Sequence, residues 1–344
     1  MPGRSGPRRG NLPLSSAKEP RLGASGAGAS SSGPVGRLAP SPTGVLHLGN
    51  ARSFLLAWLS IRQQGGRILL RIEDLDGPRV RQGATESAIE DLQWMGLDWD
   101  DEIRIQSHSR KRHDEAIDQL IDQGAAYPCV CTRKEIEEAA SAPHEGDIPA
   151  SETVYPGTCR QRWSNAEEAR HASGKEPAIR LRIESGAVPF VDQFRGPESG
   201  DVVGDFVLRK RDGTPAYQLA VVVDDAADGI TEVLRADDLI PSTPRQLLLY
   251  RLFGWDPPSF IHVPLITGPD GLRLAKRHGD TSLGHYRRQG ISAAEVVGTL
   301  AHLCGLAAEG ERWMPEDLIE QFALEKLSPN PTIWDGIRQS PGRH

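Results

Sequence analysis

The chain has 344 residues, enough for two or three domains, and its 38% hydrophobic and 25% charged content is that of an ordinary soluble protein. The sequence contains no run of about 18 apolar residues, so we expect no membrane span. A formal net charge of −7 argues against a generally basic, DNA-coating surface, although a local basic track for RNA is compatible with it. Three of the four cysteines are clustered, which fits a metal site in a reduced compartment better than a disulfide framework.

Residues 1–34 differ in composition from the rest of the chain. They are dominated by Gly, Ser, Ala, Pro and Arg, with Glu19 as the only acid. Such a segment cannot bury enough apolar surface to offset its ordering entropy, so we expect a disordered tail. No apolar segment follows the arginines, which argues against a secretory signal. The scarcity of acids would also fit an organelle transit peptide, but we prefer a solvated tail or an upstream translational start, and a cytoplasmic protein.

Residues 35–61 are predicted to form a strand, a turn rich in Gly and Pro, and a helix with one broad apolar face. The backbone N–H groups at the start of such a helix can bind an anion. Gly49 would let a nucleotide approach the first helical turn closely, and His47 could donate to phosphate oxygens that carry developing charge. On its own, a histidine two residues before a glycine would also fit an ordinary loop.

The next segments predict a parallel sheet. Residues 67–72 form a predicted buried strand, and helices are predicted at 85–95 and 108–123. Glu73 follows the strand at the edge where open α/β sheets bind ligands. It is a candidate to bind an amino group or a metal, although an acid there could instead cap the next helix. The alternation of strands and helices predicts an α/β fold with a doubly wound parallel sheet.

A cysteine cluster follows. Cys129 and Cys131 share one short turn, and Cys159 comes from a separate loop. Tetrahedral zinc requires four ligands, whereas Cys304 lies in an apolar helical context and is predicted to be in the core. The fourth ligand would have to be Tyr155, His144 or water, of which imidazole is favoured by coordination chemistry alone. Unliganded buried thiols are the alternative.

The remaining elements are predicted from periodicity. Strands are expected at 178–183, 188–195, 202–209 and 231–238, helices at 133–140 and 242–252, and a hairpin turn at 212–213. The apolar run 215–225 fits either a central strand or a buried helix with Tyr217 at its mouth. Arg235, at a predicted strand end, could bind a carboxylate with two hydrogen bonds or pair with a neighbouring aspartate.

The segment 268–280 is a basic loop flanked by glycines, which suits a mobile group that closes on a triphosphate and stabilises its transition state. A charge run of this kind is more often a solvated face. Beyond Thr281, apolar residues at helical spacing predict a small helical subdomain.

Two of these segments carry a family resemblance. The sequence R-x-A-P-S-P-T-G-x-L-H-x-G, which begins at Arg37, resembles the opening signature of glutamyl-tRNA synthetases, class I enzymes with a HIGH box. The loop Arg273-Leu274-Ala275-Lys276-Arg277 resembles their KMSKS loop. Asn50 departs from the first signature, and Arg273 and Ala275 replace lysine and serine in the second. The likeness extends from Arg37 to Leu327.

The resemblance implies the class I synthetase form of the α/β fold. This is a Rossmann-type doubly wound parallel sheet with a zinc-bearing insertion and a small C-terminal helical subdomain. The two halves of the catalytic domain would be residues 35–126 and 188–262, separated by the insertion at 127–187. The KMSKS-like loop and a helical stem-contact region would occupy residues 263–344.

The same resemblance implies roles for individual residues. Glutamate would be held by a carboxylate-binding arginine, a serine, an acid and a tyrosine, which correspond here to Arg37, Ser41, Glu73, Tyr217 and Arg235. ATP, with Mg²⁺, would be bound by His47, Gly49 and Lys276. His47 and Lys276 would be the catalytic residues.

The cysteine set resembles the zinc site of a subgroup, the glutamyl-queuosine tRNA(Asp) synthetases, in which a tyrosine completes the set. We therefore expect structural Zn²⁺ on Cys129, Cys131, Tyr155 and Cys159, with His144 as the reserve ligand. Fewer than seventy residues follow the KMSKS-like loop, too few for a further anticodon-reading domain.

Together these features imply an enzyme that activates L-glutamate with ATP. It would transfer the glutamate to the queuosine base in the anticodon of tRNA(Asp), acting as a monomer. The alternatives are a shortened synthetase that charges the 3′ end of tRNA(Glu) and an inactive paralogue that binds tRNA.

Overall fold

The computed structural model describes residues 33–140, 154–272, 274, 280–334 and 336. None of the helices in these ranges is long and apolar enough to span a membrane. The helices and strands follow one another as β1 (Val35–Leu38), α1 (Leu48–Gln63), β2 (Arg67–Ile72), α2 (Ala84–Trp94), β3 (Arg104–Ile105), α3 (Arg110–Asp122), β4 (Ala126–Cys129), α4 (Arg133–Ala140), α5 (Ala166–Ser173), β5 (Ala178–Leu181), β6 (Gly186–Asp192), β7 (Gly196–Val202), β8 (Val207–Arg209), α6 (Tyr217–Ala227), β9 (Glu232–Ala236), α7 (Thr243–Phe253), β10 (Ser259–Val263), β11 (Ile266–Thr267), α8 (Leu283–Arg288), α9 (Ala293–Leu303) and β12 (Thr332–Ile333).

The centre of the molecule is a mostly parallel sheet. Strands β1, β2 and β3 pair in parallel, and β10 pairs in parallel with both β9 and β6, while β7 adds an antiparallel edge. The two groups adjoin where the backbone N–H of Thr231, just before β9, donates to the carbonyl of Val35 at 2.9 Å. The predicted parallel α/β sheet is therefore confirmed.

Helices cover both faces of this sheet. Side chains alternate along β2, so that Ile68 and Leu70 enter a core shared with α1, whereas Leu69 enters the core that contains α3, α6 and α7. The first core is close-packed: a Cβ at Gly36 in β1 would lie 2.4 Å from Cγ1 of Ile61 in α1. Glycine at position 36 therefore lets the first strand and first helix approach each other.

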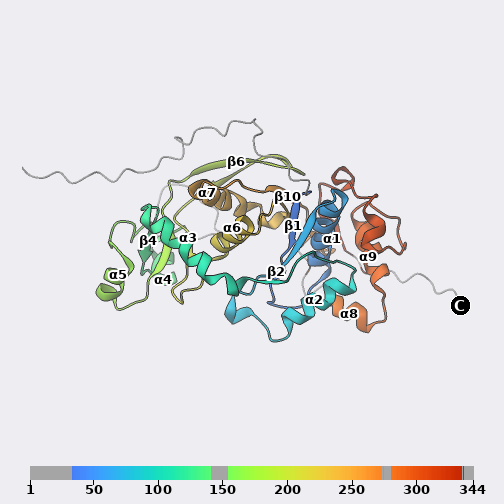
Figure 1. The fold of residues 1–344 in the computed structure, drawn as a ribbon, viewed down its shortest axis with the longest axis horizontal. Helices are drawn as coiled ribbons and strands as arrows, with labels where there is room; N and C mark the ends of the chain where they lie inside the picture. The colour runs from blue at the N-terminus through green and yellow to red at the C-terminus, as the bar shows by residue number, and fades with distance from the viewer. Residues whose placement is uncertain (1–32, 141–153, 273, 275–279, 335, 337–344) are drawn as a thin grey trace, which may run out of the picture.

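A second, antiparallel sheet of β4, β5 and β8 lies at one end of the molecule beside α5, and α8 and α9 lie at the opposite end, as Figure 1 shows. A small apolar cluster at this sheet contains Cys129, Val130, Tyr155 and Cys159, whereas Ile179, Leu181 and Leu208 of the sheet belong to the core that contains α3, α6 and α7. This cluster is separate from the two cores of the central sheet.

Two predictions about the strands need correction. The predicted strand 202–209 is interrupted, because β7 ends at Val202 and β8 begins at Val207. Gly204 between them has φ 73°, a left-handed conformation that breaks a strand and favours glycine. The residues of β7 itself, GPESGDV, were not predicted as a full strand, because they are typical turn residues. They form a strand because all seven pair with β6.

Residues 217–225 of the apolar run lie in the helix α6, so the helix alternative is correct and Tyr217 is the first residue of the helix. At the C-terminal side, α9 packs in the same core as α1. Ile266 and Thr267 of β11 pair in parallel with Thr332 and Ile333 of β12, a contact that the sequence did not predict.

Candidate functional site

The loop before α1 places His47 at the N-cap of that helix. The backbone N–H of Gly49 donates to His47 Nδ1 at 3.2 Å, and Asn50 Oδ1 accepts from the backbone N–H of His47 at 3.4 Å. Nδ1 therefore carries no proton, so a neutral His47 holds its proton on Nε2. Asn50, the departure from the family signature, thus completes a capping box.

The KMSKS-like loop is described only in part. Lys276, with Arg273, Ala275 and Arg277, lies outside the described residues, as does His144. The chain that follows the loop lies beside His47, because Leu48 N–H donates to the carbonyl of Thr281 at 3.0 Å and Leu283 N–H donates to that of Leu46 at 2.9 Å. The chain beyond the KMSKS-like loop therefore lies beside the start of α1.

Several expected glutamate-binding residues surround one small cavity. Ser41, Glu73 and Tyr217 line a cavity of about 350 Å³ together with the basic side chains of Arg79 and Lys210. Arg37, Arg235 and His47 are not among the described lining residues. The cavity is polar on several sides and is large enough for an amino acid.

A buried ionic network lies behind this cavity. Arg71 contacts Glu73 Oε1 at 3.2 Å and Asp225 Oδ1 at 2.7 Å, and Arg37 Nε lies 3.5 Å from the same oxygen of Asp225. Burial raises the pKa of Glu73, although the charges of Arg71 and Arg37 oppose the shift. Burial alone would lower the pKa of Arg71, but Asp225 and Glu73 raise it above its usual value.

Arg235 is the other buried cation of this region. It leaves the end of β9 with 5% of its surface exposed, and burial lowers its pKa. Its Nη1 and the Nε of Arg37 are buried without a hydrogen-bond partner among the described residues. Desolvation raises the pKa of Tyr217, although 42% of its surface is exposed, and the charges of Arg235 and Arg37 oppose the shift. Arg37 already contacts Asp225, whereas the free Nη1 of Arg235 is suited to bind a carboxylate.

In the family pattern a glycine follows the arginine that corresponds to Arg235, whereas this chain has Ala236. Ala236 has φ −71° and ψ 151°, an ordinary extended conformation that alanine adopts without strain. The substitution therefore leaves the backbone at the strand end intact.

Sequence reasoning missed some residues of this region. Asp225 and Tyr250 are buried beside the arginines, and the Tyr250 hydroxyl has no hydrogen-bond partner in the described part of the chain. The acidic pair at the end of the apolar run 215–225 was a usable signal, because two acids within a buried helix require buried partners.

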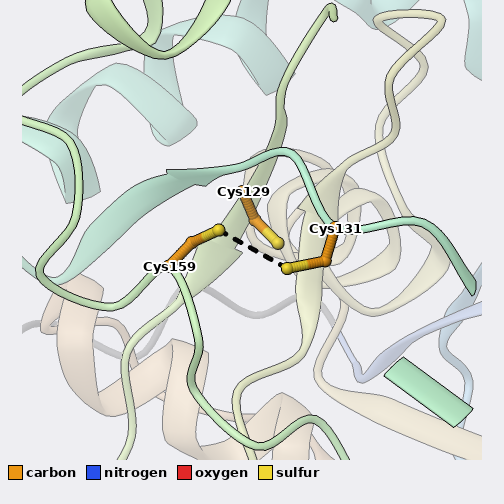
Figure 2. Close-up of side chains that lie close together, drawn as sticks. All are labelled: Cys129, Cys131 and Cys159. Carbon is orange, nitrogen blue, oxygen red and sulfur yellow. Dashed lines mark hydrogen bonds between the residues drawn. The ribbon is translucent and has the colours of Figure 1, made fainter. Parts of the chain in front are cut away.

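The cysteine cluster assembles as predicted. The ligand atoms of Cys129, Cys131 and Cys159 all lie within 4.8 Å of one another, and Figure 2 shows the three side chains converging from two segments of chain. The Sγ atoms of Cys131 and Cys159 are 3.5 Å apart.

Tyr155 joins this cluster. Its hydroxyl oxygen lies 3.3 Å from Cys129 Sγ and 3.6 Å from Cys131 Sγ, and it accepts from the backbone N–H of Cys159 at 2.8 Å. The guanidinium of Arg180 stacks on the Tyr155 ring, 4.0 Å from its centroid. Three sulfurs and one oxygen around a common point fit the tetrahedral donor set of zinc.

Comparison with known proteins agrees with this geometry. Residues 35–335 match the family model "tRNA synthetases class I (E and Q), catalytic domain". Glutamyl-Q tRNA(Asp) synthetase of Symbiobacterium thermophilum is 46% identical over 306 residues, which cover 86% of this chain and 94% of the relative. The enzyme of the same name from Nocardia farcinica is 48% identical over 302 residues, 88% of this chain and 93% of the relative.

Longer relatives also match. Glutamate–tRNA ligase of Heliobacterium modesticaldum is 39% identical over 87% of this chain and 62% of its own length. Among solved structures, a glutamate tRNA ligase from Elizabethkingia meningosepticum superposes with a TM-score of 0.75 at 30% identity, covering 88% of this chain and 67% of that one. The chain therefore belongs to the class I tRNA synthetases of the glutamyl and glutaminyl kind, and it is an aminoacyl-tRNA synthetase-like ligase.

Proposed function

We propose that the protein activates L-glutamate with ATP and transfers it to the queuosine base in the anticodon of tRNA(Asp). The names of its relatives support the substrate pair, since those that match over nearly their whole length are glutamyl-Q tRNA(Asp) synthetases. The observation that carries the glutamate assignment is the buried Nη1 of Arg235, which has no hydrogen-bond partner among the described residues and belongs to a guanidinium whose charge acts on Tyr217, a residue that lines the cavity together with Glu73.

In the proposed complex, each polar group of glutamate meets a complementary side chain. Arg37 and Arg235 bind carboxylates, Glu73 neutralises the α-ammonium group, and Ser41 and Tyr217 line the walls. Arg71 keeps Glu73 in place through the contact at 3.2 Å. This arrangement holds the attacking carboxylate in a fixed orientation.

The proposed first reaction forms glutamyl-adenylate. A carboxylate oxygen attacks the α-phosphorus of ATP, a carboxyl–phosphate bond forms, and the bond to the β-phosphate breaks to release pyrophosphate. His47 donates from Nε2 to the phosphate oxygens, Gly49 leaves room for the nucleotide, and Lys276 neutralises charge on the leaving group. Mg²⁺ bound to ATP supplies further charge neutralisation.

In the proposed second reaction, a hydroxyl of the queuosine cyclopentene ring attacks the glutamyl carbonyl. An ester forms, the hydroxyl loses its proton to solvent, the carboxyl–phosphate bond breaks, and AMP leaves with the electron pair of that bond. Single-stranded loops with splayed bases are the usual targets of proteins that read RNA, so the anticodon loop is an accessible substrate.

We further propose that zinc binds to Cys129, Cys131, Tyr155 and Cys159. The geometry supports this set, because the three sulfurs lie within 4.8 Å of one another and the Tyr155 hydroxyl lies within 3.6 Å of two of them. The ion would have a structural role, because it would join the loop of Cys159 to the end of β4.

Transfer of labelled glutamate tests the proposal. Purified protein, ATP and labelled glutamate are incubated with tRNA(Asp) that carries or lacks queuosine. In one reaction the tRNA has been oxidised with periodate, which blocks the 3′ ribose and also cleaves the queuosine diol. In a parallel reaction the tRNA is unoxidised and its 3′ end has been trimmed. We expect transfer only to trimmed, queuosine-containing tRNA.

The match to glutamate–tRNA ligases favours one alternative, charging of the 3′ end of tRNA(Glu). Transfer to intact tRNA(Glu), lost after trimming of its 3′ end, would establish that activity instead. Absence of any glutamate-dependent pyrophosphate exchange, with and without tRNA, would point to an inactive paralogue that binds tRNA.

A further inference from the structure

The hydrogen bonds of Arg235 leave one of its nitrogens unused. Its Nε donates to His262 Nε2 at 2.9 Å, and its Nη2 donates to Thr243 Oγ1 at 2.8 Å and to Gln246 Oε1 at 2.9 Å. A guanidinium has five N–H donors, so these three bonds leave only the two on Nη1. Nη1 is buried and has no partner among the described residues.

All three acceptors that hold Arg235 are uncharged. Histidine, threonine and glutamine side chains orient the guanidinium without neutralising its charge. Only 5% of the surface of Arg235 is exposed, so water does not neutralise the charge either. The carboxylate of Asp192 contacts His262 and not Arg235: its Oδ2 lies 2.7 Å from His262 Nδ1, on the side of the ring away from the guanidinium. A buried charge without a direct counter-ion is costly, so the pocket favours an anionic ligand.

The network also fixes the protonation state of His262. Its Nε2 faces Arg235 Nε–H, which always carries a proton, and it lies 3.2 Å from the hydroxyl oxygen of Thr243. Nε2 must therefore accept, and the single ring proton lies on Nδ1, where it donates to Asp192. Asp192 in turn accepts from the backbone N–H groups of Phe194 and Arg195, which hold it in position.

The orientation of Gln246 is fixed in the same way. Its Nε2 donates to Gln218 Oε1 at 3.0 Å, and Gln218 Nε2 donates to Ser242 Oγ at 3.0 Å. This chain of amides leaves Oε1 of Gln246 to face Arg235. The ring of Phe260 closes the site from another side, with its centroid 5.2 Å from the guanidinium carbon.

We propose that Asp192, His262 and Gln246 are positioning residues that present Nη1 of an uncompensated Arg235 to a carboxylate of glutamate, and that they make the site select the acid over its amide, glutamine. The inference rests on the proposed function, because it requires glutamate at Arg235. Its physical basis is that neutral acceptors orient the cation without competing for its charge, whereas a carboxylate in their place would satisfy it within the protein.

Substitution of Gln246 by glutamate tests this inference. Gln246→Glu keeps the shape of the side chain and replaces a neutral acceptor with a carboxylate next to Arg235. We expect the Kd for L-glutamate, measured by calorimetry, to rise at least fivefold, the preference over L-glutamine to fall, and the Tm not to fall. Gln289→Glu, at an exposed position, is the control for the added charge and should leave the Kd unchanged.

A rise of less than fivefold in the Kd of Gln246→Glu for L-glutamate would overturn the inference. Failure of the wild-type protein to bind L-glutamate would instead contradict the proposed function. A second pair of variants covers the case in which Gln246→Glu does not fold. His262→Gln can still accept a hydrogen bond from Arg235 Nε, so its Kd should stay within fivefold of wild type. The shorter side chain of His262→Asn cannot reach Arg235 Nε, so its Kd should rise more than fivefold. Equal Kd values in this pair would also overturn the inference.

Discussion

Arg71 and Arg235 are both buried arginines, but their surroundings differ. Arg71 contacts the carboxylates of Glu73, Asp225 and Asp228, so its charge is compensated inside the protein. Arg235 contacts only neutral acceptors through its hydrogen bonds in the described structure. The first arrangement is a structural support and the second is suited to a ligand, a distinction that residue type alone does not give.

His47 combines a structural role with a proposed catalytic role, and two substitutions separate them. His47→Ala removes both the helix cap and the Nε2 donor, whereas His47→Asn can keep an acceptor for the Gly49 N–H. Both variants should slow glutamate-dependent pyrophosphate exchange by roughly 100-fold or more. Only the alanine variant should also lose about 1 kcal/mol of stability in urea denaturation. Near wild-type exchange by His47→Asn would contradict the catalytic role.

His262 should make stability depend on pH. Burial lowers its pKa and the charge of Arg235 adds to the shift, while Asp192 and Asp237 oppose it. The unfolded chain therefore takes up a proton at about pH 6.5, before the folded protein does. The free energy of unfolding should fall as the pH drops below about 6.5, by up to about 1.4 kcal/mol per pH unit for this group.

The control for this prediction is His262→Gln, which does not titrate. Urea denaturation at intervals between pH 5 and 7 should show a smaller loss of stability in the variant than in the wild type. Identical pH dependence in the two proteins would show that His262 does not contribute.

Two of the residues predicted from the sequence lie at the ends of strands. Glu73 and Arg235 follow or end a strand, and topology places such positions at the ligand edge of a parallel sheet. The residues that orient them were not predicted: Asp192 ends β6 and His262 lies in β10, and only the pairing of those strands brings them together. A single sequence carries no signal for such a contact.

At the scale of elements, the local residue pattern was sufficient for some short segments. The predicted strand 67–72 coincides with β2, and the helix predicted at 133–140 coincides with α4. The continuous apolar run 215–225 left strand and helix open, because a fully buried element shows neither periodicity. β7 and the β11–β12 pair form only through their partners, so local propensity did not predict them.

The antiparallel sheet of β4, β5 and β8 should depend on a bound metal. Protein purified without chelator should contain about one zinc per chain, and a strong chelator should lower its Tm and increase hydrogen exchange in these strands. Cys159→Ser should lose the zinc. Cys304→Ser is the matched control and should retain it, since Cys304 lies in another core, where it accepts from Arg52 Nε at 3.2 Å.

Equal zinc content in the two serine variants would contradict the proposed ligand set. Tyr155→Phe separates the fourth ligand from the three thiols, because it keeps the aromatic ring and removes only the hydroxyl. We expect it to bind zinc more weakly than the wild type in a competition with a chromogenic chelator.

At the scale of the whole molecule, one core joins the chain from β1 to β12. It includes Leu38 of β1, Leu55 of α1, Leu300 of α9 and Trp334, which follows β12. Gln63 at the end of α1 also donates to the carbonyls of Ile319 and Phe322, at 3.1 and 2.7 Å. The region beyond the KMSKS-like loop should therefore unfold together with the central sheet.

Trp334 tests this continuity. Its side chain is 4% exposed, so Trp334→Ala should cost about 3–5 kcal/mol of stability and lower the midpoint of a single unfolding transition. The neighbouring Ile333 is 59% exposed, and Ile333→Ala should change stability by less than about 0.5 kcal/mol. Two separate transitions in the wild type, only one of them shifted by Trp334→Ala, would show that the parts unfold independently.

The position of glutamate on its tRNA product is the most direct test of the proposed function. The protein is incubated with ATP, glutamate and intact queuosine-containing tRNA(Asp), the product is digested to nucleosides, and these are analysed by mass spectrometry. We predict that the mass of a glutamyl group appears on queuosine and that the 3′-terminal adenosine remains unmodified. Glutamate on the terminal adenosine, with queuosine unchanged, would contradict the account.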